Sequence, residues 1–229
     1  MSEPHIVAQG ETLSGIARQH GFSSYKTLWD AAENKELKDK RKNPNILFPG
    51  DQLFIPDKET KDETRATDKK HRFELQAESL KIRIELMGLK NAPSAGHECT
   101  LTVEADSHEL TTKADGILEQ TISEQAKTGK IIDRGKPGEE FRIEREIPLK
   151  IGHLDPVEKV SGQIGRLNNL GYIAGDIPGH TLTSAEEEKI RKTPQFLSAV
   201  EEFQCDFGLK VDGDCGANTQ AKLVKVHGC

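Results

Sequence analysis

The sequence predicts an α+β protein built from several small domains. Apolar residues recur at helical spacing near both ends of the 229-residue chain, alternate with polar residues in its middle, and are missing from a charged stretch between the first two regions. Small units joined by a soft linker explain this pattern. We divide the chain into residues 1–57, a flexible charged linker at 58–72, a β region at 73–151 and a helical region at 152–229.

The first region is predicted to fold in the order strand, helix, helix, strand. Residues 5–8 and 52–55 have the composition of short strands. Thr12 is a suitable N-cap for a helix that ends at Gly21. A second helix follows the Ser23-Ser24 pair. Such a unit of about 50 residues needs nearly all its apolar residues to form a core.

Two segments of this region, residues 10–17 and 43–51, form a motif that resembles LysM domains over residues 5–56. The resemblance implies binding of glycans that contain N-acetylglucosamine, such as peptidoglycan or chitin, in a shallow groove between two loops. Backbone groups of the loops would bond the N-acetyl group, and an apolar rim would contact the sugar. The residues carried over are Gly10, Glu11, Thr12 and Leu13 on one wall, and Asn45, Ile46 and Leu47 on the other.

A single groove of this kind is expected to bind weakly. Each hydrogen bond contributes roughly 1 kcal/mol net, which places the dissociation constant on the order of micromolar to millimolar. This chain departs from the LysM pattern at residues 34–42, which are longer and more basic than usual. We expect a solvated helix face there, which reshapes part of the groove.

The middle region is predicted to be a small antiparallel β sandwich. Apolar residues alternate with polar ones along four runs, and Asp115-Gly116 is predicted to form a tight hairpin turn between strands. The region is similar to transthyretin-like domains, which implies a spacer or an interaction platform. The alternating residues are Phe73, Leu75, Ala77; Leu80, Ile82, Ile84, Leu86; Cys99, Leu101, Val103; and Phe141, Ile143, Ile147.

The last region is predicted to be helical. Pro156 suits the first turn of a helix whose apolar face includes Val160, Ile164 and Leu167. A second helix carries an apolar stripe that includes Val200 and Phe203, and a last short helix begins near residue 217.

The motif Phe203-Gln204 followed by residues 208–213 resembles the three-helix peptidoglycan-binding domain of many wall hydrolases, over residues 155–228. This chain is longer than the family at residues 176–193, a loop that borders the ligand surface in the family. The resemblance implies a second wall-binding surface, for which the candidates are Tyr172, Asp176 and Asp212.

We predict no catalytic site, no metal site and no cofactor. His227-Gly228-Cys229 echoes the core motif of L,D-transpeptidases, but here the tripeptide is expected only to cap a helix. Cys99 near His97 is interpreted as a small apolar filler in a strand. His153 and Asp155 lack the three or four convergent ligands of a zinc site. Cys205 and Cys215 are a candidate disulfide in an oxidising compartment.

Composition and charge limit the classes of partner that we expect the chain to bind. With 38 acidic against 32 basic residues, the chain does not suggest nucleic-acid binding, and it contains no apolar stretch long enough for membrane insertion. The first residues lack the pattern of a secretory signal. We therefore expect synthesis in the cytoplasm and action in the periplasm or at the cell wall after delivery.

The order of the regions resembles accessory proteins of contractile injection machines such as type VI secretion systems. The resemblance implies a non-enzymatic, peptidoglycan-binding accessory or targeting component with spike or effector proteins as partners. One alternative is an adaptor or cargo carrier whose domains bind proteins and have lost glycan binding. A second alternative is a cell-wall hydrolase.

Overall fold

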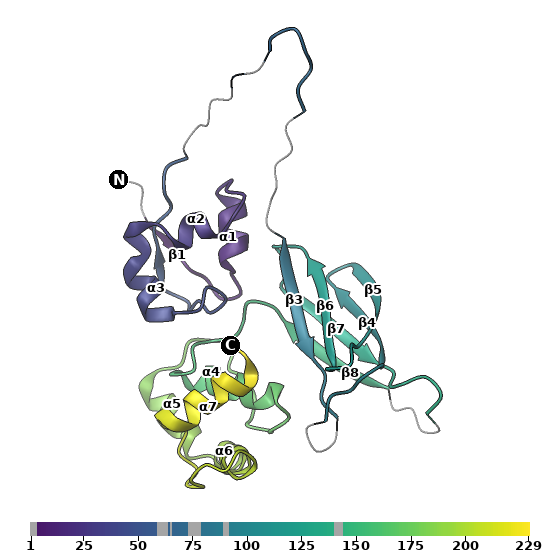
Figure 1. The fold of residues 1–229 in the computed structure, drawn as a ribbon. Helices are drawn as coiled ribbons and strands as arrows, with labels where there is room; N and C mark the ends of the chain where they lie inside the picture. Colours follow the sequence, from purple (N-terminus) through teal and green to yellow (C-terminus); the bar gives the residue numbers. More distant parts are fainter. Residues whose placement is uncertain (1–3, 59–63, 65, 73–78, 89–91, 140–143) are drawn as a thin grey trace. The chain divides into compact units, whose positions relative to one another are not determined.

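The computed structural model describes residues 4–58, 64, 66–72, 79–88, 92–139 and 144–229. It contains α-helices and antiparallel β-sheets in separate segments of the chain (Figure 1). This confirms the predicted multidomain α+β fold class.

The first segment combines two very short strands with short helices. Strands β1 (His5–Ile6) and β2 (Gln52–Leu53) pair antiparallel, with His5 opposite Leu53. The elements between them are α1 (Leu13–Gln19), α2 (Lys26–Trp29), a 3-10 helix (Ala32–Asn34) and α3 (Lys35–Arg41).

Helix α1 begins and ends where the sequence indicates. The hydroxyl oxygen of Thr12 accepts a hydrogen bond from the backbone N–H of Gly15, which caps the helix. Gly21 follows the helix with a φ of 76°, which glycine adopts without steric strain. The buried apolar side chains of the segment are Val7, Leu13, Ile16, Ala17, Leu28, Trp29, Leu37, Ile46, Leu47 and Leu53.

The basic stretch after α2 is a separate helix, α3, so the segment contains more helix than the predicted order of strand, helix, helix, strand. Helix α2 spans only four residues, and the Ser24 hydroxyl accepts a bond from the N–H of Lys26 at its start. Within α3 only Leu37 is buried. A helix with one buried residue shows no apolar periodicity, which explains why its sequence predicts little beyond a solvated face.

The β segment consists of two antiparallel sheets. Strands β3 (Leu80–Glu85) and β6 (Ile117–Ile122) form one sheet. The other has the order β5-β4-β7-β8, from β4 (Glu98–Val103), β5 (Asp106–Thr111), β7 (Thr128–Asp133) and β8 (Arg145–Lys150). Their shared core contains Leu86, Cys99, Leu101, Val103, Leu118, Ile122, Ala126 and Ile131.

The turn at Asp115-Gly116 is tight, but the predicted hairpin is wrong. The N–H of Gly116 bonds to the carbonyl of Lys113, and Gly116 has a φ of 76°. The strands on either side belong to different sheets, since β5 pairs with β4 and β6 pairs with β3. Local turn chemistry fixes the bend but not the partner strand, because strand pairing depends on distant residues.

The alternation predicted for residues 80–86 and 99–103 is confirmed by β3 and β4, whose apolar residues line or pack against the core. Cys99 is fully buried in β4, as expected for a small apolar filler. Ile147 lies in β8 and packs against the same core. The other residues of the predicted alternation, Phe73, Leu75, Ala77, Phe141 and Ile143, lie outside the described residues.

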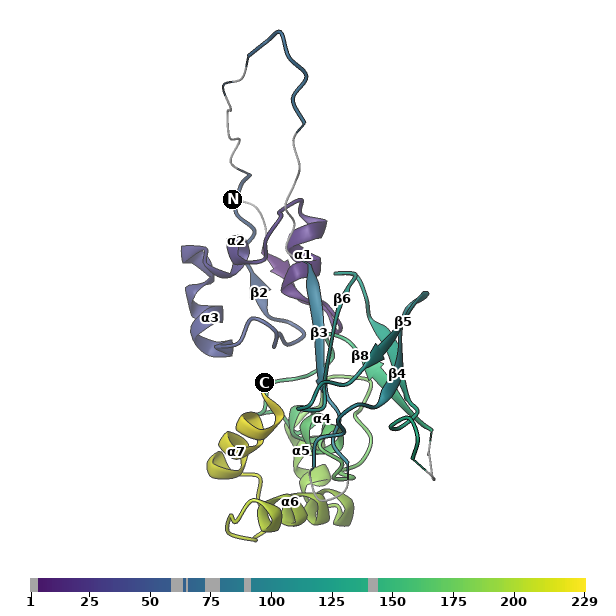
Figure 2. The same ribbon diagram turned by 45° about the vertical axis from the view of Figure 1, so that its right-hand side comes forward.

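The last segment contains helices α4 (Val160–Asn169), α5 (Ser184–Arg191), α6 (Pro194–Asp206) and α7 (Ala217–His227). Helix α4 contacts the other three (Figure 2). The predicted apolar faces of α4 and α6 are confirmed, since they supply most of the buried core. This core contains Val160, Ile164, Leu167, Tyr172, Ala174, Phe196, Ala199, Val200, Phe203, Cys215 and Leu223.

Two details of this segment differ from the sequence prediction. Pro156 is not in the first turn of a helix, because α4 begins only at Val160 after Lys159 as N-cap. Helix α5 lies within residues 176–193 and has no buried residue. It is started by a capping box, in which Thr183 and Glu186 bond to each other's backbone N–H groups. The sequence of α5 contains the Thr183 and Glu186 pair of a capping box, but it shows no apolar periodicity that would predict a helix.

Within the described part of the chain, no helix has the length and apolar character needed to cross a membrane.

Candidate functional site

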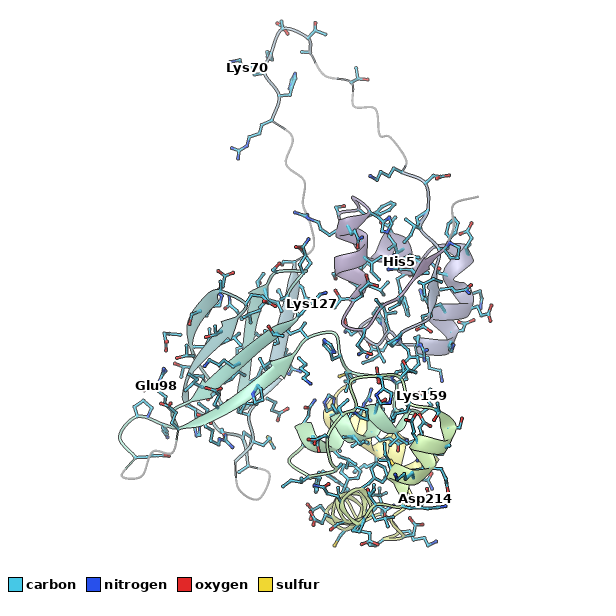
Figure 3. All side chains as sticks on the ribbon, turned by 180° about the vertical axis from the view of Figure 1, so that it is seen from behind. His5, Lys70, Glu98, Lys127, Lys159 and Asp214 are labelled. Atoms are coloured by element: carbon cyan, nitrogen blue, oxygen red, sulfur yellow. The ribbon has the colours of Figure 1, made fainter. Side chains whose placement is uncertain are left out.

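The loop between β1 and α1 is fixed by the carboxylate of Glu11. Its Oε2 atom accepts a hydrogen bond from the backbone N–H of Ala8 at 2.8 Å and lies 2.8 Å from Nε2 of His5, which Figure 3 labels. The N–H of Glu11 in turn donates to the carbonyl of Ala8. Gly10 is buried and has a φ of 80°, a conformation that side chains rarely adopt. Glu11 therefore shapes the loop in addition to any contact with a ligand.

The predicted apolar rim is not exposed. Leu13, Ile46 and Leu47 are 2%, 5% and 8% exposed, so their side chains belong to the interior. Thr12 is partly buried and caps α1. The apolar residues can therefore present backbone groups to a sugar, but they do not supply an apolar surface for it.

Asn45 is the exposed residue among the predicted contacts of the second loop. It lies in a tight turn, in which its N–H donates to Oδ1 of Asn43 at 2.9 Å and the N–H of Ile46 donates to the carbonyl of Asn43. The turn leads into a connection to β1, where the N–H of Gly50 donates to the carbonyl of Val7. The Asn45 side chain thus stands on a well-braced turn.

A buried ion pair braces this loop from α3. Arg41 donates to both carboxylate oxygens of Asp51, from Nε to Oδ2 and from Nη2 to Oδ1, each at 2.7 Å. The Asp51 side chain is only 3% exposed and also accepts from the N–H of Phe48 at 3.0 Å. The Arg41 guanidinium lies 5.6 Å from the centre of the Phe48 ring. Sequence reasoning missed this pair, because charged residues in a basic run look solvated.

Replacing Arg41 by alanine is expected to destabilise this segment by about 2–3 kcal/mol, because Asp51 loses its bidentate partner while staying buried. We also expect glycan binding to weaken by about tenfold as the Asn45 turn loosens. Lys40→Ala is the matched control: Lys40 is exposed and its Nζ lies 3.7 Å from Asp51, so its removal should change either quantity little. Thermal unfolding and titration with chitin oligosaccharides measure the two effects. Equal losses in both variants would contradict the bracing role.

The second predicted surface consists of residues that the fold itself uses. Tyr172 is buried, and its hydroxyl donates to Oδ2 of Asp206 at 2.8 Å. Burial and the bond to Asp206 raise the Tyr172 pKa above its ordinary value. Asp176 is exposed, in the loop between α4 and α5.

Asp212 belongs to a network around Gln204, a buried residue of α6. The Gln204 amide nitrogen bonds to Oδ1 of Asp212 at 2.9 Å, and its amide oxygen accepts from the N–H groups of Asp212 and Gly213. The hydrogen bond from Gln204 is the main cause of the lowered Asp212 pKa. The amide nitrogen also lies within hydrogen-bond distance of the carbonyl of Asp214, which Figure 3 labels. Gln204 therefore organises the whole loop between α6 and α7.

The four cysteines are free thiols. Cys205 is exposed on α6, whereas Cys215 is enclosed in the core, and burial raises the Cys215 pKa to about 12. One side chain faces solvent and the other the interior, so the candidate Cys205–Cys215 disulfide does not form in this structure.

His97 and Asp133 lie close to the buried thiol of Cys99. His97 Nδ1 lies 2.9 Å from Asp133 Oδ1, and burial raises the pKa of nearby Cys99 to about 11. In the described ranges, no group of three or more His, Cys, Asp or Glu side chains is placed to hold a metal ion.

The protein is modular, and two of its small segments each carry a loop that a polar side chain holds in place. Arg41 holds the loop of the first segment and Gln204 holds that of the last. Residues 5–56 match the family model of the LysM domain, and residues 165–223 match that of a family described as "Putative peptidoglycan binding domain". No curated protein and no solved structure matches the chain. The two family matches agree with the domain composition expected from the sequence, and they support peptidoglycan binding and action at the cell wall.

Proposed function

We propose that the protein is a non-catalytic binder of peptidoglycan glycan strands. The observation that carries the proposal is the exposed Asn45, held on a turn that the Arg41–Asp51 pair braces, within the segment similar to LysM domains. A braced turn binds with little loss of conformational entropy, which suits a shallow glycan site. The proposed contacts are the Asn45 side chain together with backbone groups of residues 10–13 and 45–47.

Replacing Asn45 by alanine tests this site. One lost hydrogen bond is worth about 1 kcal/mol, so we expect roughly fivefold weaker binding of chitin oligosaccharides in a calorimetric titration. The fold should be unchanged, because the Asn45 bond within the turn comes from its backbone N–H. Gln19→Ala removes an exposed amide of α1 and serves as the control. Unchanged affinity in Asn45→Ala would remove Asn45 from the site.

We further propose that the segment similar to the peptidoglycan-binding family supplies a second, weaker site near Tyr172, Asp176 and Asp212. Of these, Asp176 is the exposed side chain in the loop before α5 and the best candidate for direct contact. The β segment would act as a transthyretin-like spacer between the two sites. Its paired sheets and shared core suit a rigid separator.

The proposal for delivery is that the protein accompanies a contractile injection system of the type VI kind. It would be made in the cytoplasm and reach the periplasm or wall with spike or effector proteins. The support is the order of segments in the sequence, a LysM-like unit, a β spacer and a peptidoglycan-binding-like unit. Co-purification with spike components from cells tests this association.

An adaptor function is the second candidate, favoured by exposed apolar side chains on the last segment. Ile173 is 74% exposed and Val211 is 53% exposed, in two loops of that segment. Exposed apolar residues of this size are common at protein interfaces. Binding to a spike or effector protein that is lost in Ile173→Asp, without any binding to glycan, would favour the adaptor over the glycan binder.

A further inference from the structure

A cysteine, a histidine and an asparagine form a line of hydrogen-bonded side chains between the ends of α4 and α7. Sγ of Cys229 is 3.2 Å from Nδ1 of His227, and Nε2 of the same ring is 3.0 Å from Nδ2 of Asn169. Neither bond belongs to the proposed glycan sites. A nucleophile, a base and a group that orients the base are the parts of an activated thiol.

The backbone at the end of α7 positions the cysteine beside the histidine. Helix α7 ends at His227, and Gly228 takes a φ of 90° while its N–H donates to the carbonyl of Val224. This left-handed turn brings Cys229 back beside the ring of His227. Nε of Arg166, which is buried in α4, donates to the carbonyl of Cys229 at 2.7 Å and holds it there.

Near neutral pH the ring of His227 can accept a proton and the sulfur of Cys229 holds one. Burial, followed by the charge of Arg166, lowers the His227 pKa to about 4, so the ring is neutral near pH 7. Burial raises the Cys229 pKa, and Arg166 opposes that rise. Arg166 is the charged group that acts on both, and it is itself influenced by Asp155 and Glu158. The sulfur is therefore mainly a thiol, which needs a base to react at neutral pH.

Asn169 fixes the ring in either orientation of its amide. With the amide nitrogen toward the ring, Nε2 accepts and Nδ1 carries a proton that it can donate to a thiolate. With the amide oxygen toward the ring, Nε2 donates and Nδ1 accepts the thiol proton. Only the second arrangement leaves Nδ1 free to take up the thiol proton, so the base role of His227 requires the amide oxygen of Asn169 to face the ring.

We propose that Cys229 is a reactive thiol that exchanges with disulfide compounds, with His227 as its base and Asn169 as a positioning residue. The thiol proton moves to His227 as the sulfur attacks one sulfur of the disulfide. A new S–S bond forms to Cys229, the old S–S bond breaks, and the departing thiolate takes up the proton. One thiol and one disulfide are consumed, and one of each is formed.

The other three cysteines lack this arrangement. Cys99 and Cys215 are 0% and 1% exposed and have raised pKa values. Cys205 is exposed on α6 and can react, but without a histidine hydrogen-bonded to its sulfur in the described contacts. Disulfide exchange also fits better than amide hydrolysis, because exchange requires no donors for an oxyanion.

Dithiodipyridine, whose released thiopyridone absorbs light, tests the proposal on the full chain. In a Cys205→Ser background, one equivalent should react in the native protein, and peptide mass spectrometry should place the adduct on Cys229. His227→Gln should slow this reaction about tenfold or more at about pH 6. Asn169→Ala should slow it less. A Cys229 that does not react, or that reacts at the same rate in His227→Gln, would overturn the proposal.

The pH profile separates base assistance from simple exposure. The rate for Cys229 should change little between about pH 5 and 8 and fall near pH 4, where His227 becomes protonated. In Cys229→Ser the reporter is Cys205, and a thiol without a base reacts faster as pH rises. A rate for Cys229 that rises in the same way over this range, without a plateau, would show that His227 gives no assistance and would overturn the proposal.

Discussion

Replacing Arg166 by methionine is expected to destabilise the last segment by about 3–5 kcal/mol. The Arg166 side chain is 1% exposed, and its guanidinium donates to three backbone carbonyls, those of Asp155, Gly162 and Cys229, at 2.7 to 2.8 Å. Methionine fills a similar volume but donates no hydrogen bond, so the three carbonyls lose their partner in the interior. Burial also lowers the Arg166 pKa, because the charged guanidinium is removed from water.

Urea unfolding followed by circular dichroism measures this loss, and hydrogen exchange of residues 155–229 localises it. Arg191→Met is the matched control, because Arg191 makes one hydrogen bond among the described residues, from Nη1 to Oε1 of Gln163 at 3.2 Å. We expect that control to cost under about 1 kcal/mol. Arg166→Lys should recover part of the stability, since it keeps the charge but not the fork of donors. If Arg166→Met and Arg191→Met lose equal stability, the account of Arg166 is wrong.

Separating the two proposed wall-binding segments is expected to lower retention on peptidoglycan by about a hundredfold. Each site alone binds weakly, and tethering turns the second binding step into an intramolecular one. Introducing a protease site within residues 58–72 allows the chain to be cut between the two segments. Retention on insoluble peptidoglycan before and after cutting measures the effect.

The same chain without the protease site, treated with the same protease, is the control for this experiment. Retention that is unchanged by cutting would mean that one segment carries all of the binding. Retention that falls for both halves, with each half still folded, is the result expected for two weak sites.

Helix caps and buried helical faces were predictable from the sequence because their causes are local. Thr12 caps α1 and Gly21 follows it, and the stripe of Phe196, Val200 and Phe203 is buried in α6 as its spacing indicates. Helix α3 was anticipated only as a solvated helix face and α5 not at all, since they bury one residue and none. Strand partners were missed at Gly116 because sheet pairing is decided at a distance.

The candidate site was predictable in position but not in how it is built. The turn at Asn45 follows from its Asn-Pro-Asn composition. The partner of Asp51 is Arg41, ten residues earlier, and the partner of Cys229 in α4 is Arg166, 63 residues earlier. Such pairs depend on tertiary packing, so no spacing in the sequence shows them. The apolar residues Leu13, Ile46 and Leu47 look like a rim in sequence but are needed inside a small core.

Co-sedimentation of the full chain with purified sacculi tests the central claim most directly. The account predicts that the chain sediments with sacculi, that Asn45→Ala weakens this binding, and that no muropeptides are released during the incubation. A chain that is folded but stays in the supernatant at concentrations up to about millimolar would contradict peptidoglycan binding. Release of muropeptides by the chain would contradict its non-catalytic character.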